Sequence, residues 1–351
     1  MSKDLKNKNR NLINWLVENN IDYLIDFELK KKSWLKCGGI AKLFIEPDTV
    51  NKTENLGKYL IKEKMEYYPI GNLSNTLIRD GEIYTPIINL KRIKDPIIKL
   101  EDNSEYILLK VSSGLSIFKF ISHIISNFKI SGLEGMIGIP GTIGGAMITN
   151  ASSYDSCISD FLTKVNYVNE KGEIISILKK DINFNWRSSI FKKMSNFLIT
   201  EVFFRFPKKN IKNINEIQQR VNYVKNHRET FQEKKFPNLG SLYATKNLYY
   251  DLSKLSISLF LLYVIYILGT KFVYIFLDQT NLLKFRKLIV KLYCLYFKIP
   301  KNKFSMSSKT INCLVNIGSS SANDAIETIQ ILEKKIKGRI KLENVILKDL
   351  K

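Results

Sequence analysis

The stretch that most constrains this chain is residues 132–154, which read GLEGMIGIPGTIGGAMITNASSY. Its centre, residues 138–146, places four glycines and one proline among apolar side chains. Because glycine has no Cβ and tolerates positive φ, such a turn brings several backbone N–H groups close to a bound phosphate. The spacing differs from both the GxGxxG dinucleotide fingerprint and the P-loop. From the glycines alone, a phosphate cradle and a tight structural turn remain equally open.

Read as a whole, this stretch resembles the flavin-binding signature of the UDP-N-acetylenolpyruvoylglucosamine reductases, the MurB-type flavoenzymes. The resemblance covers most of residues 33–245 and about 305–345. It is carried by residues 132–134, 138–146, 150–151 and Tyr154, and then, in the family's order along the chain, by residues 38–41 with 46–47, 71–75, 186–191 and 240–241.

The resemblance implies an α+β fold. A two-lobed FAD-binding domain of the vanillyl-alcohol-oxidase-like type would precede a smaller α+β substrate-binding domain that carries an apolar helical insertion. We expect the following division: an N-terminal helical extension over 1–32, the FAD-binding domain over 33–207 with lobes of about 33–95 and 96–207, and the substrate-binding domain over 208–351 with its insertion at about 250–300. Residue periodicity adds a helix over 115–128, a hairpin over 165–177, a strand over 197–206 and a polar helix over 208–235.

The insertion contains an almost wholly apolar run, residues 255–277, in which Lys271 is the only charged residue. A membrane-spanning helix needs about 20 apolar residues, so the run is borderline in length. Three interpretations are open, in order of preference: a helix buried in the substrate-binding domain, an interfacial helix giving peripheral membrane contact, and a transmembrane span. Basic residues follow the run: Lys284, Arg286, Lys287 and Lys291.

The formal net charge of +22 is compatible with nucleic acid, an anionic membrane or anionic small molecules. No lysine cluster alternates with aromatics as a nucleic-acid platform does, so we expect no nucleic-acid partner and favour a phosphate-bearing substrate. Four scattered cysteines without a CxxC pair and only two histidines lead us to expect no metal site. With no apolar secretory segment at the start, we expect a cytoplasmic protein, and membrane association through residues 255–277 stays open.

Hydride transfer is beyond ordinary side chains, so it requires a cofactor that the protein binds and orients. The resemblance implies that FAD takes a hydride from NADPH and passes one to UDP-N-acetylglucosamine enolpyruvate, giving UDP-N-acetylmuramate for peptidoglycan. It assigns FAD to the following residues: Gly71, Asn72, Leu73, Ser74, Asn75, Gly138, Ile139, Pro140, Gly141, Thr142, Gly144, Gly145, Ala146 and Asn150.

Three residues are the candidates for catalysis. Hydride addition places negative charge on the enolpyruvyl carboxylate, and Arg187 occupies the motif position of a cation that would stabilise it. Ser241 matches the family's proton-donating serine. Glu343 either matches the family's catalytic glutamate near the C-terminus or a neighbouring structural one.

Departures from the family pattern leave alternatives open. Ala244 and Thr245 stand where the family has lysine and asparagine, Leu73 replaces a glycine, and Trp186 replaces a tyrosine. One alternative is an FAD-dependent oxidoreductase that acts on another nucleotide sugar or surface-glycan precursor at the membrane face. The other is a catalytically inactive flavin-fold binding protein.

Overall fold

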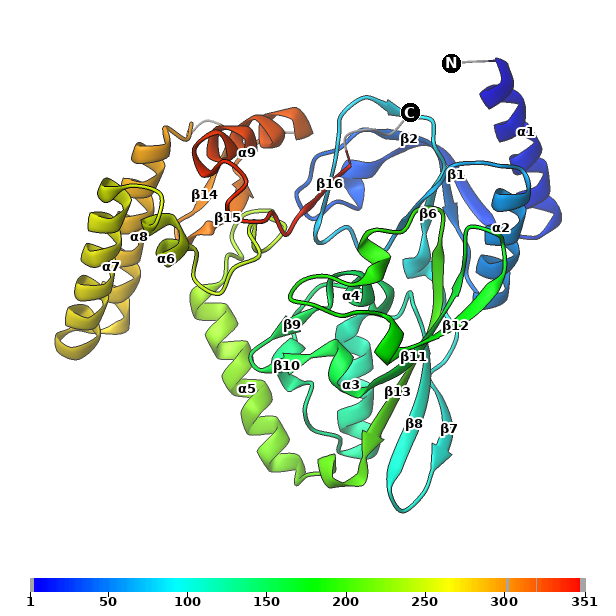
Figure 1. Ribbon diagram of the computed structural model, residues 1–351, viewed down its shortest axis with the longest axis horizontal. Helices are drawn as coiled ribbons and strands as arrows, with labels where there is room; N and C mark the ends of the chain where they lie inside the picture. The colour runs from blue at the N-terminus through cyan, green and yellow to red at the C-terminus, as the bar shows by residue number, and fades with distance from the viewer. Residues whose placement is uncertain (1–2, 301–302, 320, 348–351) are drawn as a thin grey trace.

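The first lobe is built on a five-stranded sheet (Figure 1). The structure is a computed structural model that describes residues 3–300, 303–319 and 321–347. The sheet runs in the order β1–β2–β6–β3, with β5 beside β2, and is parallel except for the β1–β2 pair. The elements of the first lobe are α1 (Lys3–Glu18), β1 (Asp22–Glu28), β2 (Ile40–Glu46), α2 (Val50–Lys62), β3 (Tyr68–Ile70), β4 (Thr76–Ile78), β5 (Glu82–Ile83) and β6 (Ile87–Asn89).

The N-terminal region is only partly the helical extension that the sequence predicts. The amphipathic pattern holds for α1, whose Leu12 and Leu16 are fully buried against α2 and the sheet. The prediction is wrong beyond that point, because Asp22–Glu28 pairs along β2 as the sheet's edge strand. The helix therefore ends at Glu18, and the apolar residues that follow lie in a strand.

The second lobe holds a fully antiparallel sheet in the order β12–β11–β13–β8–β7. Helix α3 covers one of its faces with Phe120, which packs on Phe204 and Phe206 of β13. The hairpin over 165–177 and the strand over 197–206 are confirmed. The elements are β7 (Ile98–Asp102), β8 (Tyr106–Ser112), α3 (Ile117–Phe128), α4 (Ile143–Thr149), β9 (Ser152–Ser153), β10 (Ser156–Cys157), β11 (Leu162–Val168), β12 (Ile174–Leu178) and β13 (Leu198–Pro207).

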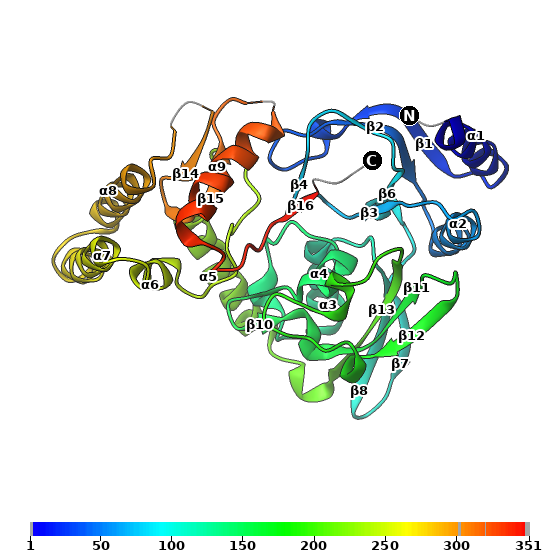
Figure 2. The same cartoon turned by 45° about the horizontal axis from the view of Figure 1, so that its top comes forward.

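Helix α5 (Ile214–Phe231) leads from the second lobe to the C-terminal part of the chain, as Figure 2 shows. There a two-stranded sheet packs with helices around one core that includes Tyr293, Phe297 and Phe304. The elements are α6 (Leu248–Ser253), α7 (Ile257–Phe276), α8 (Gln279–Phe297), β14 (Phe304–Ser307), β15 (Thr310–Asn316), α9 (Ala322–Ile336) and β16 (Val345–Leu347).

The C-terminal part is tied back to the first lobe at two places. Strand β16 pairs in parallel with β4, so the end of the described chain returns to the Gly71 region. The carboxylate of Asp80 caps α9 by accepting hydrogen bonds from Ser321 Oγ at 2.6 Å and from the backbone N–H of Ala322 at 2.8 Å. These contacts hold the C-terminal part in fixed relation to the first lobe.

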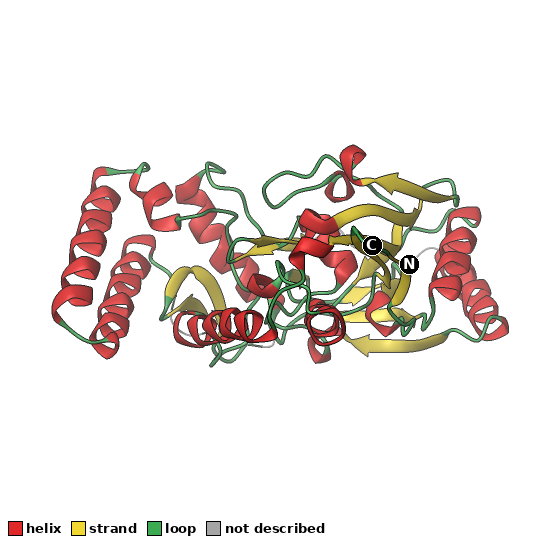
Figure 3. Ribbon diagram, turned by 90° about the horizontal axis from the view of Figure 1, so that it is seen from below, coloured by secondary structure: helices red, strands yellow, loops and turns green. Residues whose placement is uncertain are grey.

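Helix α7 forms from the apolar run but is not buried. Figure 3 shows α7 and α8 side by side at one end of the molecule. Only Leu259 and Val273 of its 20 residues are buried, so our favoured prediction of a buried helix is wrong. The reason is the order of packing: α8 contacts β14, β15 and α9, whereas α7 contacts α6 and α8 and forms an outer layer.

Candidate flavin site and catalytic cluster

Two glycine-bearing loops from the two lobes meet face to face. One is the Gly71 loop (residues 71–75), between β3 and β4, and the other is the Gly138 loop (residues 138–142), which leads into α4. The Asn72 side chain donates a hydrogen bond to the carbonyl of Pro140 at 2.5 Å. A Cβ on Gly71 would lie 2.5 Å from Thr142 Oγ1, so only glycine permits this close approach. The two loops predicted from the sequence to share a ligand therefore lie in contact with each other.

These loops present unused backbone donors. Within the described residues, the amides of Leu73, Ser74, Gly141 and Thr142 make no hydrogen bond. Backbone N–H groups seek partners, and a diphosphate supplies several acceptor oxygens to such a set. Leu73 holds a φ of 49° where the family has glycine. The backbone keeps its left-handed turn despite the substitution.

A buried arginine that sequence reasoning missed supports the Gly138 loop from below. Arg228, on α5, is 7% exposed and donates to the carbonyl of Gly135 at 2.9 Å and to Ser153 Oγ at 2.7 Å. A Cβ on Gly138, whose φ is +86°, would lie 3.2 Å from Arg228 Cδ. The Nε–H of Arg228 has no hydrogen-bond partner among the described residues. The surrounding α5 is polar, so the sequence carries no signal that this arginine is buried.

Three features of this site fit FAD. The loops form a glycine cradle that a Cβ would fill, their backbone amides are free, and the adjacent Arg228 has an unsatisfied Nε–H. Gly144 has a packing task in addition, because its N–H bonds the carbonyl of Ser113 at 2.8 Å and an added Cβ would lie 2.9 Å from Ser113 Cβ. Gly145 donates its N–H to Thr142 Oγ1 at 3.3 Å. Ile139 and Ala146 also bond locally, through Met136 and Thr142.

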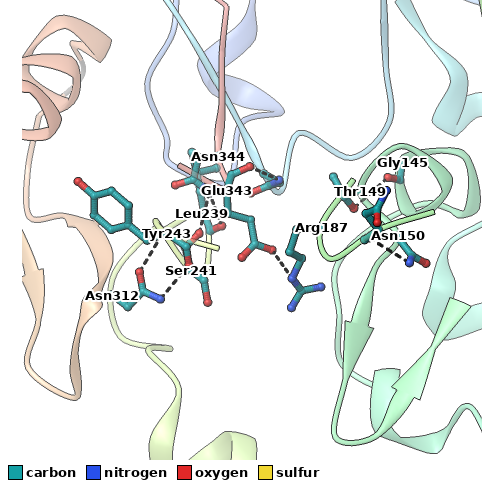
Figure 4. A network of polar contacts seen from close by, with 12 residues as sticks. Gly145, Thr149, Asn150, Arg187, Leu239, Ser241, Tyr243, Asn312, Glu343 and Asn344 are labelled. Atoms are coloured by element: carbon teal, nitrogen blue, oxygen red, sulfur yellow. Dashed lines mark hydrogen bonds and ion pairs between the residues drawn. The ribbon is translucent and has the colours of Figure 1, made fainter. Parts of the chain in front are cut away.

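Asn75 connects the Gly71 loop to the C-terminal part. Its side chain donates to the carbonyl of Glu343 at 3.3 Å and accepts from Asn344 Nδ2 at 2.6 Å. Asn344 Nδ2 also lies 3.1 Å from the carbonyl of Ser241 (Figure 4). One amide pair therefore fixes Ser241 and Glu343 beside the flavin loop. The Ser241 side chain is exposed, and its hydroxyl has no partner among the described residues.

Arg187 and Glu343 form an ion pair within this cluster (Figure 4). Arg187 Nε lies 3.0 Å from Glu343 Oε1, and both side chains are largely shielded from solvent. The contact is electrostatic rather than an aligned hydrogen bond. Arg187 adopts a φ of 53°, an uncommon conformation for a non-glycine residue that is often found at functional sites. Asn150, at the end of α4, supports this segment by donating to the carbonyl of Asn185 at 3.3 Å.

The surroundings of Glu343 perturb the pKa of its carboxyl. Burial raises the pKa of the Glu343 carboxyl, and the positive charges of Arg187 and Lys192 oppose the rise. Burial lowers the pKa of the Lys192 ammonium, and Lys341 adds to that fall. A carboxyl that is buried beside a fixed guanidinium is placed to hold Arg187 where negative charge develops on a substrate. Lys192 follows the Arg187 motif without belonging to it, so motif matching alone could not find it.

A hollow of about 430 Å³ opens next to this cluster. It is lined by Trp186, Ala244, Thr245, Lys246, Asn247, Tyr250 and Asp251. Lys246 Nζ lies 5.8 Å from the centre of the Trp186 ring. The aromatic face and the cation together suit a ligand that carries a flat base and negative charge. In the described residues, no group of three or more His, Cys, Asp or Glu side chains is placed to hold a metal ion.

Comparison with known proteins agrees with this geometry. Residues 41–178 match a protein family described as an FAD binding domain. The UDP-N-acetylenolpyruvoylglucosamine reductase of Exiguobacterium sibiricum is 32% identical over 220 residues, which cover 63% of this chain and 69% of that protein. The enzyme of the same name from Staphylococcus carnosus is 30% identical over 219 residues, covering 62% and 68%.

A solved structure shares the fold. The crystal structure of UDP-N-acetylenolpyruvylglucosamine reductase from Thermus caldophilus aligns with a TM-score of 0.61 at 18% identity, over 93% of this chain and 99% of that one. The matched domain and the named relatives define an FAD-dependent oxidoreductase, and the shared fold has the predicted α+β architecture. Within that class, the chain belongs to the UDP-N-acetylenolpyruvoylglucosamine reductase family.

Proposed function

We propose that this protein reduces UDP-N-acetylglucosamine enolpyruvate to UDP-N-acetylmuramate, with NADPH as the reductant, in the synthesis of peptidoglycan precursors. FAD supplies hydride transfer between NADPH and the enolpyruvyl double bond when it is bound. The protein's own task is to hold the flavin, to orient the enolpyruvyl group and to manage one proton and one developing negative charge.

The Gly71 and Gly138 loops bind the flavin in this proposal. The free amides of both loops would hold the diphosphate, and the side chains of Ser74 and Asn75 would add donors. The full set of assigned residues is Gly71, Asn72, Leu73, Ser74, Asn75, Gly138, Ile139, Pro140, Gly141, Thr142, Gly144, Gly145, Ala146 and Asn150. Arg228 positions the Gly138 loop from below.

The catalytic roles fall to Arg187, Ser241 and Glu343. Arg187 stabilises the negative charge that develops on the enolpyruvyl carboxylate. Ser241 donates a proton from its unpaired hydroxyl to the substrate carbon, and Glu343 holds and orients Arg187. The observation that carries the proposal is a chain of contacts at the edge of the Gly71 loop. Asn75 bonds Glu343 and Asn344, and these two in turn contact Arg187 and Ser241.

The nucleotide part of the substrate is assigned to the hollow beside Trp186. Lys246 and Asn247 follow two residues after the positions where the family has lysine and asparagine. Lys246 lies in that hollow, so it supplies the cation that Ala244 lacks. This arrangement favours the enolpyruvyl sugar over a substrate without a diphosphate.

We place the reaction in the cytoplasm, where NADPH is available, and we place the protein in peripheral contact with the membrane through residues 255–277. Contact with a membrane would bring the enzyme to the site where cell-wall precursors are used.

Product analysis tests the reaction. Purified protein is incubated with NADPH and UDP-N-acetylglucosamine enolpyruvate, and the nucleotide sugar is identified by mass spectrometry. We expect a product heavier by two hydrogens, formed in step with NADPH loss. Full flavin occupancy without that product would support the alternative that another nucleotide sugar is the substrate. A chain that cannot be loaded with FAD would support the non-enzymatic alternative.

A further inference from the structure

One face of α7 exposes apolar side chains along the whole helix. Its members are spaced by three or four residues, so they share one side of the helix, and their exposed fractions lie between 49% and 73%. We call this the α7 face, made of Ile257, Leu261, Ile265, Leu268, Phe272 and Ile275. A continuous apolar surface of this kind marks an interaction site on a soluble protein.

The opposite side of α7 is firmly packed, so the α7 face has a fixed direction. A Cβ on Gly269 would lie 2.2 Å from Phe285 Cζ, which shows how closely α8 approaches. At the open end of the helix pair, Ser256 Oγ lies 3.0 Å from Tyr296 OH. The α7 face therefore points outward from the molecule rather than toward a neighbouring element.

The helix pair is strongly basic. Residues 257–298 contain one acidic residue, Asp278, and six basic residues: Lys271, Lys284, Arg286, Lys287, Lys291 and Lys298. Three of these, Lys284, Lys287 and Lys291, are exposed and share one side of α8. Salt bridges within the described residues engage none of the three. An apolar face flanked by unpaired cations matches a surface with an apolar interior and anionic head groups.

We propose that the α7 face docks onto an anionic lipid bilayer, with α7 lying in the plane of the interface. This proposal does not depend on the proposed reaction. A second copy of the chain fits less well, because symmetric pairing through α7 would bring the unpaired lysines of both copies together.

A membrane span fits less well than an interfacial helix, although α7 has the length and hydropathy for one. Because α7 and α8 are antiparallel and α8 packs in the core through Ile289, Tyr293 and Phe297, α7 could insert only with the tip of α8. That tip carries Lys284, Arg286 and Lys287, and charged side chains are costly inside a bilayer.

Vesicle flotation tests the proposal with the full, FAD-loaded chain. The probes are phosphatidylcholine vesicles and vesicles in which about a third of the lipid is phosphatidylglycerol. We expect flotation with the anionic vesicles, weaker flotation with the neutral ones, and loss of the difference as salt is raised. Absence of flotation with both would overturn the proposal.

Two variants separate the apolar and the charged contributions. Leu261→Glu with Leu268→Glu should lower partitioning at least about tenfold while the flavin spectrum stays unchanged. Phe118→Glu, at a half-exposed apolar site on α3, is the matched control and should float like the wild type. Lys284→Gln, Lys287→Gln and Lys291→Gln together should weaken binding to anionic vesicles by about fivefold per lysine and leave binding to neutral vesicles unchanged.

Two results from these variants would contradict the proposal. Unchanged flotation of both the glutamate and the glutamine variants would exclude the α7 face. A concentration-dependent dimer in sedimentation velocity, lost in the glutamate variant and accompanied by no vesicle binding, would assign the face to a second copy instead.

Discussion

Arg187 Nε lies 3.0 Å from Glu343 Oε1, although Arg187 precedes β13 and Glu343 lies just before β16, close to the end of the chain. The contact exists because β16 returns beside β4 and because Asn75 bonds the backbone of Glu343. The guanidinium is thereby held in one place at the edge of the flavin loops. The predictions below follow from this arrangement.

The pH dependence of stability should report on Glu343. Burial raises its pKa in the folded state above the unfolded value of 4.5, so its stabilising contribution is fully present below 4.5 and is lost as pH rises through the folded pKa. Glu343→Gln cannot ionise. The free energy of unfolding of the variant, relative to wild type, should therefore increase from about pH 4 to about pH 7.

Urea unfolding of the FAD-free protein across that pH range is the measurement. Glu105→Gln, at an exposed turn carboxylate, is the control for loss of a surface charge. A difference between Glu343→Gln and wild type that stays constant with pH would mean that folding leaves the pKa of Glu343 unchanged.

Loss of the Ser241 hydroxyl should affect one half of the reaction. Ser241→Ala leaves the cradle intact, so reduction of the flavin by NADPH should be unchanged. Proton donation to the substrate is removed, and reoxidation of reduced flavin by the enolpyruvyl sugar should slow by about 10²- to 10⁴-fold. Stopped-flow absorbance separates the two steps, with exposed Ser126→Ala on α3 as the control. Equal slowing of both steps would remove Ser241 from the proton-donor role.

Arg187→Lys should also slow the second half of the reaction. Lysine keeps the charge but not the planar fork that can contact a carboxylate and Glu343 at the same time. We expect a loss of about 10²-fold in the rate of flavin reoxidation, with the affinity for FAD unchanged. A fall in FAD affinity of similar size would instead place Arg187 among the flavin contacts.

Arg228→Lys should weaken the flavin site without touching the catalytic cluster. Lysine cannot replace the bonds to Gly135 and Ser153, and a buried charged hydrogen bond contributes about 1.5–3 kcal/mol. We expect a lower free energy of unfolding and a dissociation constant for FAD raised about tenfold or more. Fluorescence titration with FAD measures the second effect. The neighbouring, more exposed Arg220→Lys should have a much smaller effect, and equal effects would contradict a special role for Arg228.

The family resemblance assigned residues 71–75 and 138–146 to a flavin, and local patterns in the sequence were sufficient for the glycine-rich turn and for much of the second lobe. The glycines of residues 138–146 predicted a tight turn, and alternation of apolar residues located the hairpin of β11 and β12. Both signals are local, because turns and strand faces depend on neighbouring residues.

Features that depend on tertiary contacts could not be predicted in this way. Glu343 remained ambiguous until β16 placed it beside Arg187, and the cap of α9 comes from Asp80 in another lobe. Arg228 lies in a polar helix and gives no sign of burial. The prediction of a buried helix over residues 255–277 was wrong for a related reason. Composition measures how apolar a helix is, but the order in which α8 and α7 pack decides which one is covered.

The most direct test of the proposed function is the visible spectrum of the protein after anaerobic reduction by NADPH, followed as UDP-N-acetylglucosamine enolpyruvate is added. We predict that the absorption bands of oxidised flavin return within the time of a single turnover. A spectrum that stays reduced, in protein that binds FAD and accepts hydride from NADPH, would contradict the assignment of this substrate.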